Sequence, residues 1–245
     1  MIYDEGTYSF NYYFLNFMNR INVSVFILVF VGLFLFETHS AAATWTPEES
    51  FNSYSVGADL NGGSGGSGWS GNWVRASSPN NPIVAEASVT YDGSTSVRTT
   101  SNNAGVYRSL GSLTAGSLYV AMRKTSTSSG SWYLTLGDGS YPTDRMAIRA
   151  GTGGNIEIYD NNTGYQTITA YNADQWYVIN IEFDNTNHAN QYRARVHDGI
   201  SWSSFSSWYT VSGGSYSGII YVSPQGDCSG ITCYWDTIQS ANPLS

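Results

Sequence analysis

Charged side chains are scarce in this sequence. Lys, Arg, Asp and Glu make up 11% of its 245 residues, and acidic residues outnumber basic ones by 18 to 10. Nine of the ten basic residues follow residue 43, and only Lys124 is a lysine. Because contacts to nucleic-acid phosphates need clustered Lys and Arg, this composition argues against a nucleic-acid partner. Gly, Ser, Thr, Asn and Tyr supply the polar surface, which suits an extracellular β-protein.

Helical periodicity and histidine are also lacking. Apolar residues after residue 43 do not recur at spacings of three and four, so no helix is predicted there that could carry a nucleophile elbow. His188 and His197 are the only histidines in that part of the chain, too few for a transition-metal cluster.

The chain has two cysteines, Cys228 and Cys233, in the stretch "DCSGITC". One C-x4-C pair cannot supply four zinc ligands, and no histidine lies near it. The redox alternative would need C-x-x-C at a helix N-terminus, which is absent. In a secreted protein the pair predicts a disulfide that closes a short loop.

One long apolar run is present, Ile21–Phe36. It is shorter than the roughly 20 residues that a helix needs to span a bilayer. Met18–Arg20 precedes it with one positive charge, and the small residues of Ser40–Ala43 follow it. These features predict a secretory signal peptide within residues 1–43.

Asp4 and Glu5 do not suit the start of a signal peptide, which favours Met18 as the true start and residues 1–17 as a mis-annotated start. The alternative is an uncleaved membrane anchor. After cleavage, residues 44–245 would form one secreted, extracellular domain with no membrane contact.

Alternating apolar residues interrupted by turn residues every eight to twelve positions predict an all-β protein. About a dozen strands in one domain imply a sandwich of two packed antiparallel sheets. The candidate strands are residues 49–54, 95–100, 105–110, 117–124, 131–137, 144–150, 155–160, 165–169, 175–184, 191–198, 217–224 and 233–239.

Two expected hairpins bring opposite charges together. The loop "NTNHAN" joins two strands and would place Glu182 and Asp184 opposite Arg193 and Arg195. In the second hairpin, around "GTGG", Arg145 and Arg149 come within reach of Glu157 and Tyr159.

The stretch "LNGGSGGSGWSGNWV", residues 60–74, has six glycines and two tryptophans. A flexible tether has no use for tryptophan, whose burial contributes a few kcal/mol. The stretch therefore predicts a shaped loop of the domain that folds back onto the core.

Three segments resemble the concanavalin A-like lectin/glucanase superfamily, the laminin-G-like jelly rolls: residues 48–73, "DQWYVINIEFD" at 174–184 and "YWDTIQ" at 234–239. The resemblance spans residues 48–239. It implies a two-sheet antiparallel jelly-roll β-sandwich in which the first and last strands pair.

Glucanases of this superfamily carry three carboxylates on one strand. Glu182 and Asp184 match the first two, but Thr186 and Asn187 stand where the third would be. Since glycosidases need two carboxylates placed across the sugar, we favour surface ion pairs over catalysis for Glu182 and Asp184.

Lyases of the same class use a Tyr/His pair with Arg and Gln, and His197, Arg193, Arg195 and Gln191 share one candidate strand face. "QYRARVHD" does not match the lyase motifs, so a lyase stays the alternative, with Glu182, Asp184 and His197 as the residues of any enzyme.

The resemblance also implies one structural Ca²⁺ where the last strand meets the first. Asp236 is its best ligand, with Glu49 or the carbonyls near Asn61 and Gly62 as partners. Calcium takes six to eight oxygens, of which the sequence can show only some. The alternative is that Asp236 caps a turn or meets an arginine.

Sugar binding requires exposed aromatic rings beside planar polar groups. Tyr133, Tyr159, Arg145 and Glu157 could form such a surface on a sheet, and Trp202 and Trp208 another on a loop. The alternative for each ring is packing in the core or across strands.

These features together predict a secreted, non-catalytic polysaccharide-binding β-sandwich. A polysaccharide-degrading enzyme with a diverged site is the first alternative. A self-assembling extracellular structural protein is the second, because low charge and abundant Tyr, Gly and Asn suit association through strand edges.

Overall fold

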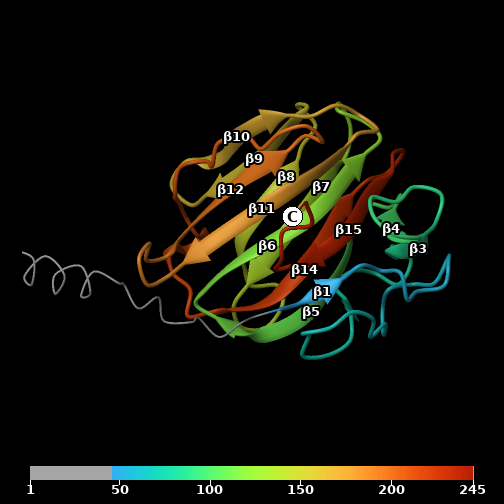
Figure 1. The fold of residues 1–245 in the computed structure, drawn as a ribbon, viewed down its shortest axis with the longest axis horizontal. Coiled ribbons are helices and arrows are strands. Elements are labelled where there is room, and N and C mark those ends of the chain that lie inside the picture. Colours follow the sequence, from blue (N-terminus) through green and yellow to red (C-terminus); the bar gives the residue numbers. More distant parts are fainter. Residues whose placement is uncertain (1–45, 245) are drawn as a thin grey trace, which may run out of the picture. The chain divides into compact units, whose positions relative to one another are not determined.

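Two antiparallel sheets pack face to face in a computed structural model, which describes residues 46–244 (Figure 1). The first sheet has eight strands: β13 (Tyr209–Thr210), β12 (Gln191–His197), β11 (Trp176–Asp184), β6 (Ala115–Lys124), β15 (Cys233–Gln239), β4 (Ser96–Thr99) and β3 (Val84–Glu86) in spatial order, with β1 (Glu48–Glu49) paired to β15. The second has seven: β10 (Gly164–Ala170), β9 (Asn155–Asp160), β8 (Asp144–Ala150), β7 (Ser131–Gly137), β14 (Ile219–Asp227), β5 (Ala104–Leu113) and β2 (Val74–Arg75). The predicted all-β jelly-roll sandwich is confirmed.

Strand alternation builds the core between the sheets. In β8, Met146, Ile148 and Ala150 are fully buried, whereas Arg145, Ala147 and Arg149 point outward. The same period of two recurs in β9 and β12 and in the first half of β7, so each strand contributes its apolar face to one continuous core.

Two tryptophans connect the sheets. Trp132 of β7 and Trp235 of β15 stack with their ring centroids 5.7 Å apart, and both are fully buried. The indole N–H of Trp132 donates to the carbonyl of Tyr234, and that of Trp235 donates to the carbonyl of Tyr133. Each buried N–H is therefore satisfied by the backbone of the opposite sheet.

The glycine loop is part of the domain, as predicted. Trp73 is buried beside Phe51 and Leu60, and Trp69 packs against the same core. Gly66 and Gly68 have positive φ and lie so close to the carbonyls of Glu48 and Thr46 that an added Cβ would collide with them.

A buried ion pair anchors this loop. Arg108 donates to the Glu49 carboxylate at 2.8 Å and also to the carbonyls of Gly65 and Gly71. Its guanidinium lies 5.1 Å from the Trp69 ring centroid and 5.7 Å from that of Trp73.

The first and last strands pair as predicted, with Glu49 opposite Ile238. The predicted strand at 49–54 is much shorter, however. It ends at Glu49 because Phe51 adopts a positive φ of 58°, which begins the turn into the glycine loop. The short strands β2, β3 and β13 and the 3-10 turn η1 (Ser212–Gly214) were not predicted.

The predicted β11–β12 hairpin forms, but only one of its two ion pairs does. Glu182 lies opposite Arg193 and accepts from it at 2.8 Å. Register places Asn180, not Asp184, opposite Arg195. Asp184 instead accepts backbone N–H groups of Thr186 and Asn187 in the turn.

Cys228 and Cys233 form the predicted disulfide, with 6.1 Å between their Cα atoms. Residues 1–43, the predicted signal peptide, lie outside the described residues. Between residues 46 and 244 there is no helix with the length and apolar character to cross a membrane.

Candidate functional site

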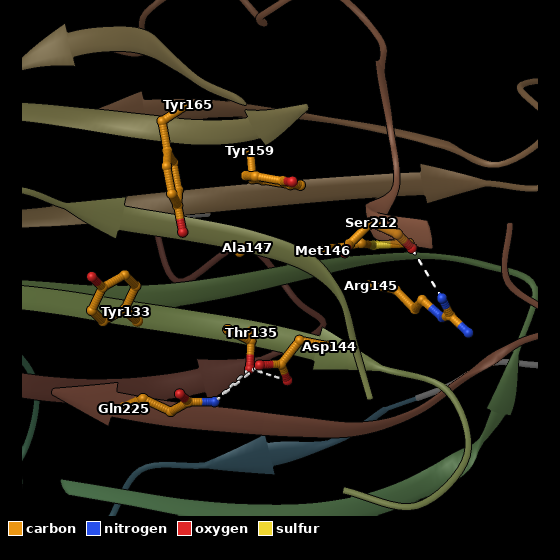
Figure 2. Close-up of a pocket in the computed structure, with 10 residues that line it drawn as sticks. All are labelled: Tyr133, Thr135, Asp144, Arg145, Met146, Ala147, Tyr159, Tyr165, Ser212 and Gln225. Carbon is orange, nitrogen blue, oxygen red and sulfur yellow. Dashed lines mark hydrogen bonds between the residues drawn. The ribbon is translucent and has the colours of Figure 1, made fainter. Parts of the chain in front are cut away.

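The outer face of the seven-stranded sheet carries a hollow of about 260 Å³ (Figure 2). Alternation turns polar and aromatic side chains of β7, β8, β9 and β10 toward it while their neighbours enter the core. Its lining residues are Tyr133, Thr135, Asp144, Arg145, Met146, Ala147, Tyr159, Tyr165, Ser212 and Gln225.

A second hollow of about 210 Å³ adjoins the first and shares Tyr133 and Gln225 with it. Its other lining residues are Ala76, Asn103, Ala104, Gly105, Tyr141, Gly226 and Asp227. The two adjoining hollows are together called the tyrosine groove below.

The first hollow lies where β8 and β9 separate. Tyr192, a fully buried residue of the other sheet, inserts its hydroxyl between these strands. The hydroxyl accepts the Ala147 N–H at 3.1 Å and donates to the Tyr159 carbonyl at 2.5 Å. It thereby replaces direct β8–β9 hydrogen bonds, while the small Ala147 side chain leaves space above it.

Three tyrosine rings surround this hollow. Tyr159 and Tyr165 are opposite each other on β9 and β10 and meet edge to face, with ring centroids 5.3 Å apart. Tyr133 comes from β7, which β8 separates from the β9 strand of Tyr159 (Figure 2). The Arg149 guanidinium lies 3.6 Å from the Tyr165 ring centroid.

Asp144 is the acceptor at the centre of a hydrogen-bond network on the groove floor. Thr135 donates to it at 2.8 Å and Tyr221 at 2.9 Å, and the Gln225 amide lies 3.4 Å from its second oxygen. Gln225 also donates to the Thr135 hydroxyl at 2.9 Å (Figure 2). The network fixes these polar groups at the surface of a rigid sheet.

Burial shifts the acidity of the tyrosines. It raises the pKa of Tyr165 to about 12, with a smaller contribution from neighbouring Tyr133. It also raises the pKa of Tyr221, which the adjacent Asp144 carboxylate raises further. Both phenols are therefore neutral hydrogen-bonding groups at physiological pH.

A tyrosine cluster borders the second hollow. The rings of Tyr107 and Tyr141 are parallel, with centroids 4.8 Å apart, and Tyr221 meets both rings edge to face. Tyr141 therefore has a packed position although it lies in the loop between β7 and β8.

The structure brings most of the first predicted sugar-binding set together. Tyr133, Arg145 and Tyr159 all line the first hollow. Glu157 lies beside it and is paired with Arg149 at 2.6 Å, the ion pair expected from that hairpin. Arg145 is paired with Asp138 instead of Glu157 or Tyr159.

Trp202 and Trp208 lie on the other sheet, in a cation–aromatic stack along β12. Residues 202–208 run beside this strand, where Ser203 and Ser206 hydrogen-bond to the backbone of Val196 and Ala194. Every third residue of this segment places an aromatic ring over an arginine. In spatial order the stack contains His197, Trp202, Arg195, Phe205, Arg193, Trp208 and His188.

The predicted enzyme residues are not brought to the groove. Glu182 and Asp184 of β11 and His197 of β12 belong to the eight-stranded sheet. Glu182 is bound by Arg193, and Asp184 holds the following turn. Their catalytic role stays a prediction.

Asp236 and Glu49 do not offer their oxygens to a cation. Asp236 is fully buried and accepts the backbone N–H groups of Tyr91, Asp92 and Thr237. Burial raises its pKa to about 7 against the effect of these bonds. Glu49 accepts from Arg108 and from several neutral donors.

Among residues 46–244, no three His, Cys, Asp or Glu side chains are grouped so as to hold a metal ion. The donor set does not fit a calcium site well, because the carboxylates face N–H groups that a cation would have to displace. The calcium site stays a prediction.

Sequence reasoning missed Asp144, Gln225 and Tyr165 as groove residues. Tyr165 could have been found from the short loop between its strand and that of Tyr159, which favours a hairpin that places the two rings opposite each other. Gln225 is opposite Tyr133 across the β14–β7 pair, 92 positions away in sequence, and no local pattern shows that pairing.

The sequence matches no known protein family. It also matches no curated protein. Solved structures do match. A Crh5 transglycosylase in complex with NAG gives a TM-score of 0.50 at 9% identity, covering 82% of this chain and 86% of that one. This chain has the concanavalin A-like fold.

Two further matches have TM-scores of 0.49. The alginate lyase Aly36B is 10% identical, and the match covers 81% of this chain and 97% of the lyase. A sialidase is 9% identical, and the match covers 69% of this chain but only 16% of the sialidase chain. At these identities the likeness concerns the fold alone.

Proposed function

We propose that the tyrosine groove binds a polysaccharide without cleaving it. The observation that carries the proposal is the combination, on one open sheet face, of the Tyr133, Tyr159 and Tyr165 rings with a fixed set of hydrogen-bonding groups. Aromatic faces stack on the C–H groups of a pyranose, and planar polar side chains bind its hydroxyls.

The groove offers the required donors and acceptors. Gln225 provides an amide, Asp144 a carboxylate and Arg145 a guanidinium already oriented by Asp138 and the Ser212 carbonyl. These groups lie on strands of a rigid sheet, so little conformational entropy is lost on binding. The fold likeness to a transglycosylase solved with NAG agrees with a glycan partner, although a fold alone does not fix function.

Two observations favour binding over catalysis. The two groove carboxylates, Asp144 and Asp227, line different hollows, whereas hydrolysis of a glycosidic bond requires two carboxylates on either side of one sugar ring. A tyrosine base would need a lowered pKa, but the pKa of Tyr165 is raised to about 12.

Secretion is part of the same proposal. The Cys228–Cys233 disulfide supports an oxidising compartment, which agrees with the signal peptide predicted within residues 1–43. The partner would then be an extracellular glycan.

The proposal is tested by mixing the protein with a panel of soluble and insoluble polysaccharides. Depletion of protein from solution measures binding, and release of reducing or unsaturated ends measures cleavage. We expect saturable depletion with no new ends. New ends would instead select an enzyme, and neither signal on a broad panel would direct attention to self-assembly.

A further inference from the structure

The arginines on the groove face are neutralised by the protein itself. Arg145 is paired with Asp138 at 2.5 Å and also donates to the Ser212 carbonyl. Arg149 is paired with Glu157 at 2.6 Å and covers the Tyr165 ring. Neither guanidinium is left as an unpaired positive charge for an anionic ligand.

The groove carboxylates have no such neutralisation. Asp144 accepts only from neutral donors, namely Thr135, Tyr221 and Gln225. Asp227 lines the second hollow at the exposed end of β14. Within residues 46–244, neither carboxylate forms an ion pair. The groove therefore combines two uncompensated negative charges with paired, neutral arginine sites.

We infer that the groove selects an uncharged glycan over an acidic one, with Asp144 and Asp227 as the residues that set this specificity. The inference rests on the proposed function and adds the substrate class. Sugar hydroxyls donate to carboxylates in charge-assisted hydrogen bonds, which are stronger than neutral ones. A uronate or sulfate group in the same place would meet like charges with no cation between them.

The positions of Asp144 and Asp227 set how strongly the groove should prefer a neutral glycan over an acidic one. Two like charges about 4 Å apart at a protein surface reduce affinity by about tenfold or more. The repulsion is screened by salt, with a Debye length of about 8 Å at physiological ionic strength. Binding of an acidic glycan should therefore strengthen as salt is added, whereas binding of its neutral counterpart should stay nearly constant.

The test uses the purified protein and three matched pairs of oligosaccharides of equal length and linkage: glucan and glucuronan, mannan and mannuronan, galactan and galacturonan. Within a pair the two members differ only in the carboxylate at C6. Calorimetric titration at low and at physiological salt gives the affinity ratio of each pair. We expect the neutral member of the bound pair to bind at least about tenfold tighter at low salt.

Charge-removing variants assign the effect to residues. Asp144→Asn keeps an acceptor oxygen, and Asp227→Asn changes an exposed residue. Each variant should bind the acidic member of the pair better. The ratio of neutral to acidic affinity should therefore fall severalfold. Asp174→Asn is the matched control, because it removes the same charge from an exposed residue that pairs with Arg123, a residue of the other sheet. The neutral-to-acidic affinity ratio of Asp174→Asn should equal that of the unchanged protein.

The outcomes separate the two proposals. Equal or tighter binding of the acidic member would overturn the charge inference alone, because the groove would still bind a glycan. A neutral preference that neither variant changes would also overturn it. Binding of none of the six oligosaccharides and of no polysaccharide in the broad panel would overturn the proposed function, and this inference with it.

Discussion

Lys124, the only lysine of the chain, is fully buried. Its amine donates to the Gly151 carbonyl at 3.1 Å and to the Tyr171 hydroxyl at 2.8 Å, and none of the ion pairs in the described residues includes it. Burial lowers the pKa of Lys124 to about 8. The folded protein therefore loses this proton at a lower pH than the unfolded chain does.

The sign of the pH dependence follows directly. Between pH 8 and about 10.4, the unfolded chain holds a proton on Lys124 that the folded protein has lost, so the contribution of this residue to stability rises with pH. Integrating over this difference gives a contribution of about 2 kcal/mol to the free energy of unfolding from pH 8 to pH 9.5.

Tyrosine ionisation offsets much of this gain by pH 9.5 and outweighs it above pH 10. There the unfolded tyrosines ionise, whereas the pKa values of Tyr54, Tyr165 and Tyr171 in the folded protein are raised to about 12 by burial. Deprotonation then favours the unfolded chain, and stability falls.

Urea denaturation at pH 8.0 and 9.5 measures the effect. The Lys124→Met variant keeps a flexible apolar side chain of similar length and the same tyrosines, so it should lack only the contribution of Lys124. From pH 8.0 to pH 9.5 the wild type should therefore gain about 2 kcal/mol in the free energy of unfolding relative to this variant. An equal change in stability for the two proteins would refute the reasoning.

Three further predictions concern other residues. Arg108→Met should lower the free energy of unfolding by about 3–5 kcal/mol in urea titrations, because it leaves Glu49 buried and unpaired; a loss below 1 kcal/mol would contradict the buried ion pair. Tyr192→Phe should lower the free energy of unfolding by about 1–3 kcal/mol and weaken glycan binding, because the Ala147 N–H and the Tyr159 carbonyl lose their partner. An unchanged free energy of unfolding together with an unchanged glycan affinity would rule out the role of Tyr192 at the hollow. EDTA should leave the melting temperature unchanged, since the oxygens of Asp236 accept N–H groups; a drop that Ca²⁺ restores would support the calcium site.

Local patterns were enough to predict the strands that matter here. Alternation in "DRMAIRA" and "NIEIYD" placed Arg145, Tyr159 and Glu157 on an outer face, and the hairpin between them produced the Arg149–Glu157 pair. A hairpin fixes its register through a short loop, so its cross-strand pairs can be read from sequence.

Long-range pairing could not be predicted in this way. β14 lies between β7 and β5 although it is far from both in sequence, and this arrangement brings Gln225 and Tyr221 to the groove. The separation of β8 from β9 likewise depends on Tyr192 of the opposite sheet. Such sites arise from the packing of one sheet on another, which no window of sequence contains.

One incorrect prediction shows how strongly cross-strand side-chain partners depend on the register of a hairpin. Asp184 was expected opposite Arg195, but Arg195 pairs with Asn180. Asp184 instead accepts N–H groups in the turn that follows β11, a role that Asp often takes where a strand ends.

The central claim is that glycan binding occurs at the tyrosine groove and not at the cation–aromatic stack. The most direct measurement compares the glycan affinity of Tyr133→Ala, a groove variant, with that of Trp202→Ala, a stack variant, against the polysaccharide that depletes the unchanged protein best. The account predicts a loss of about tenfold or more for Tyr133→Ala, since a stacking ring contributes on the order of 1–3 kcal/mol, and little change for Trp202→Ala. The reverse result, with binding lost only in Trp202→Ala, would contradict the account and move the site to the other sheet.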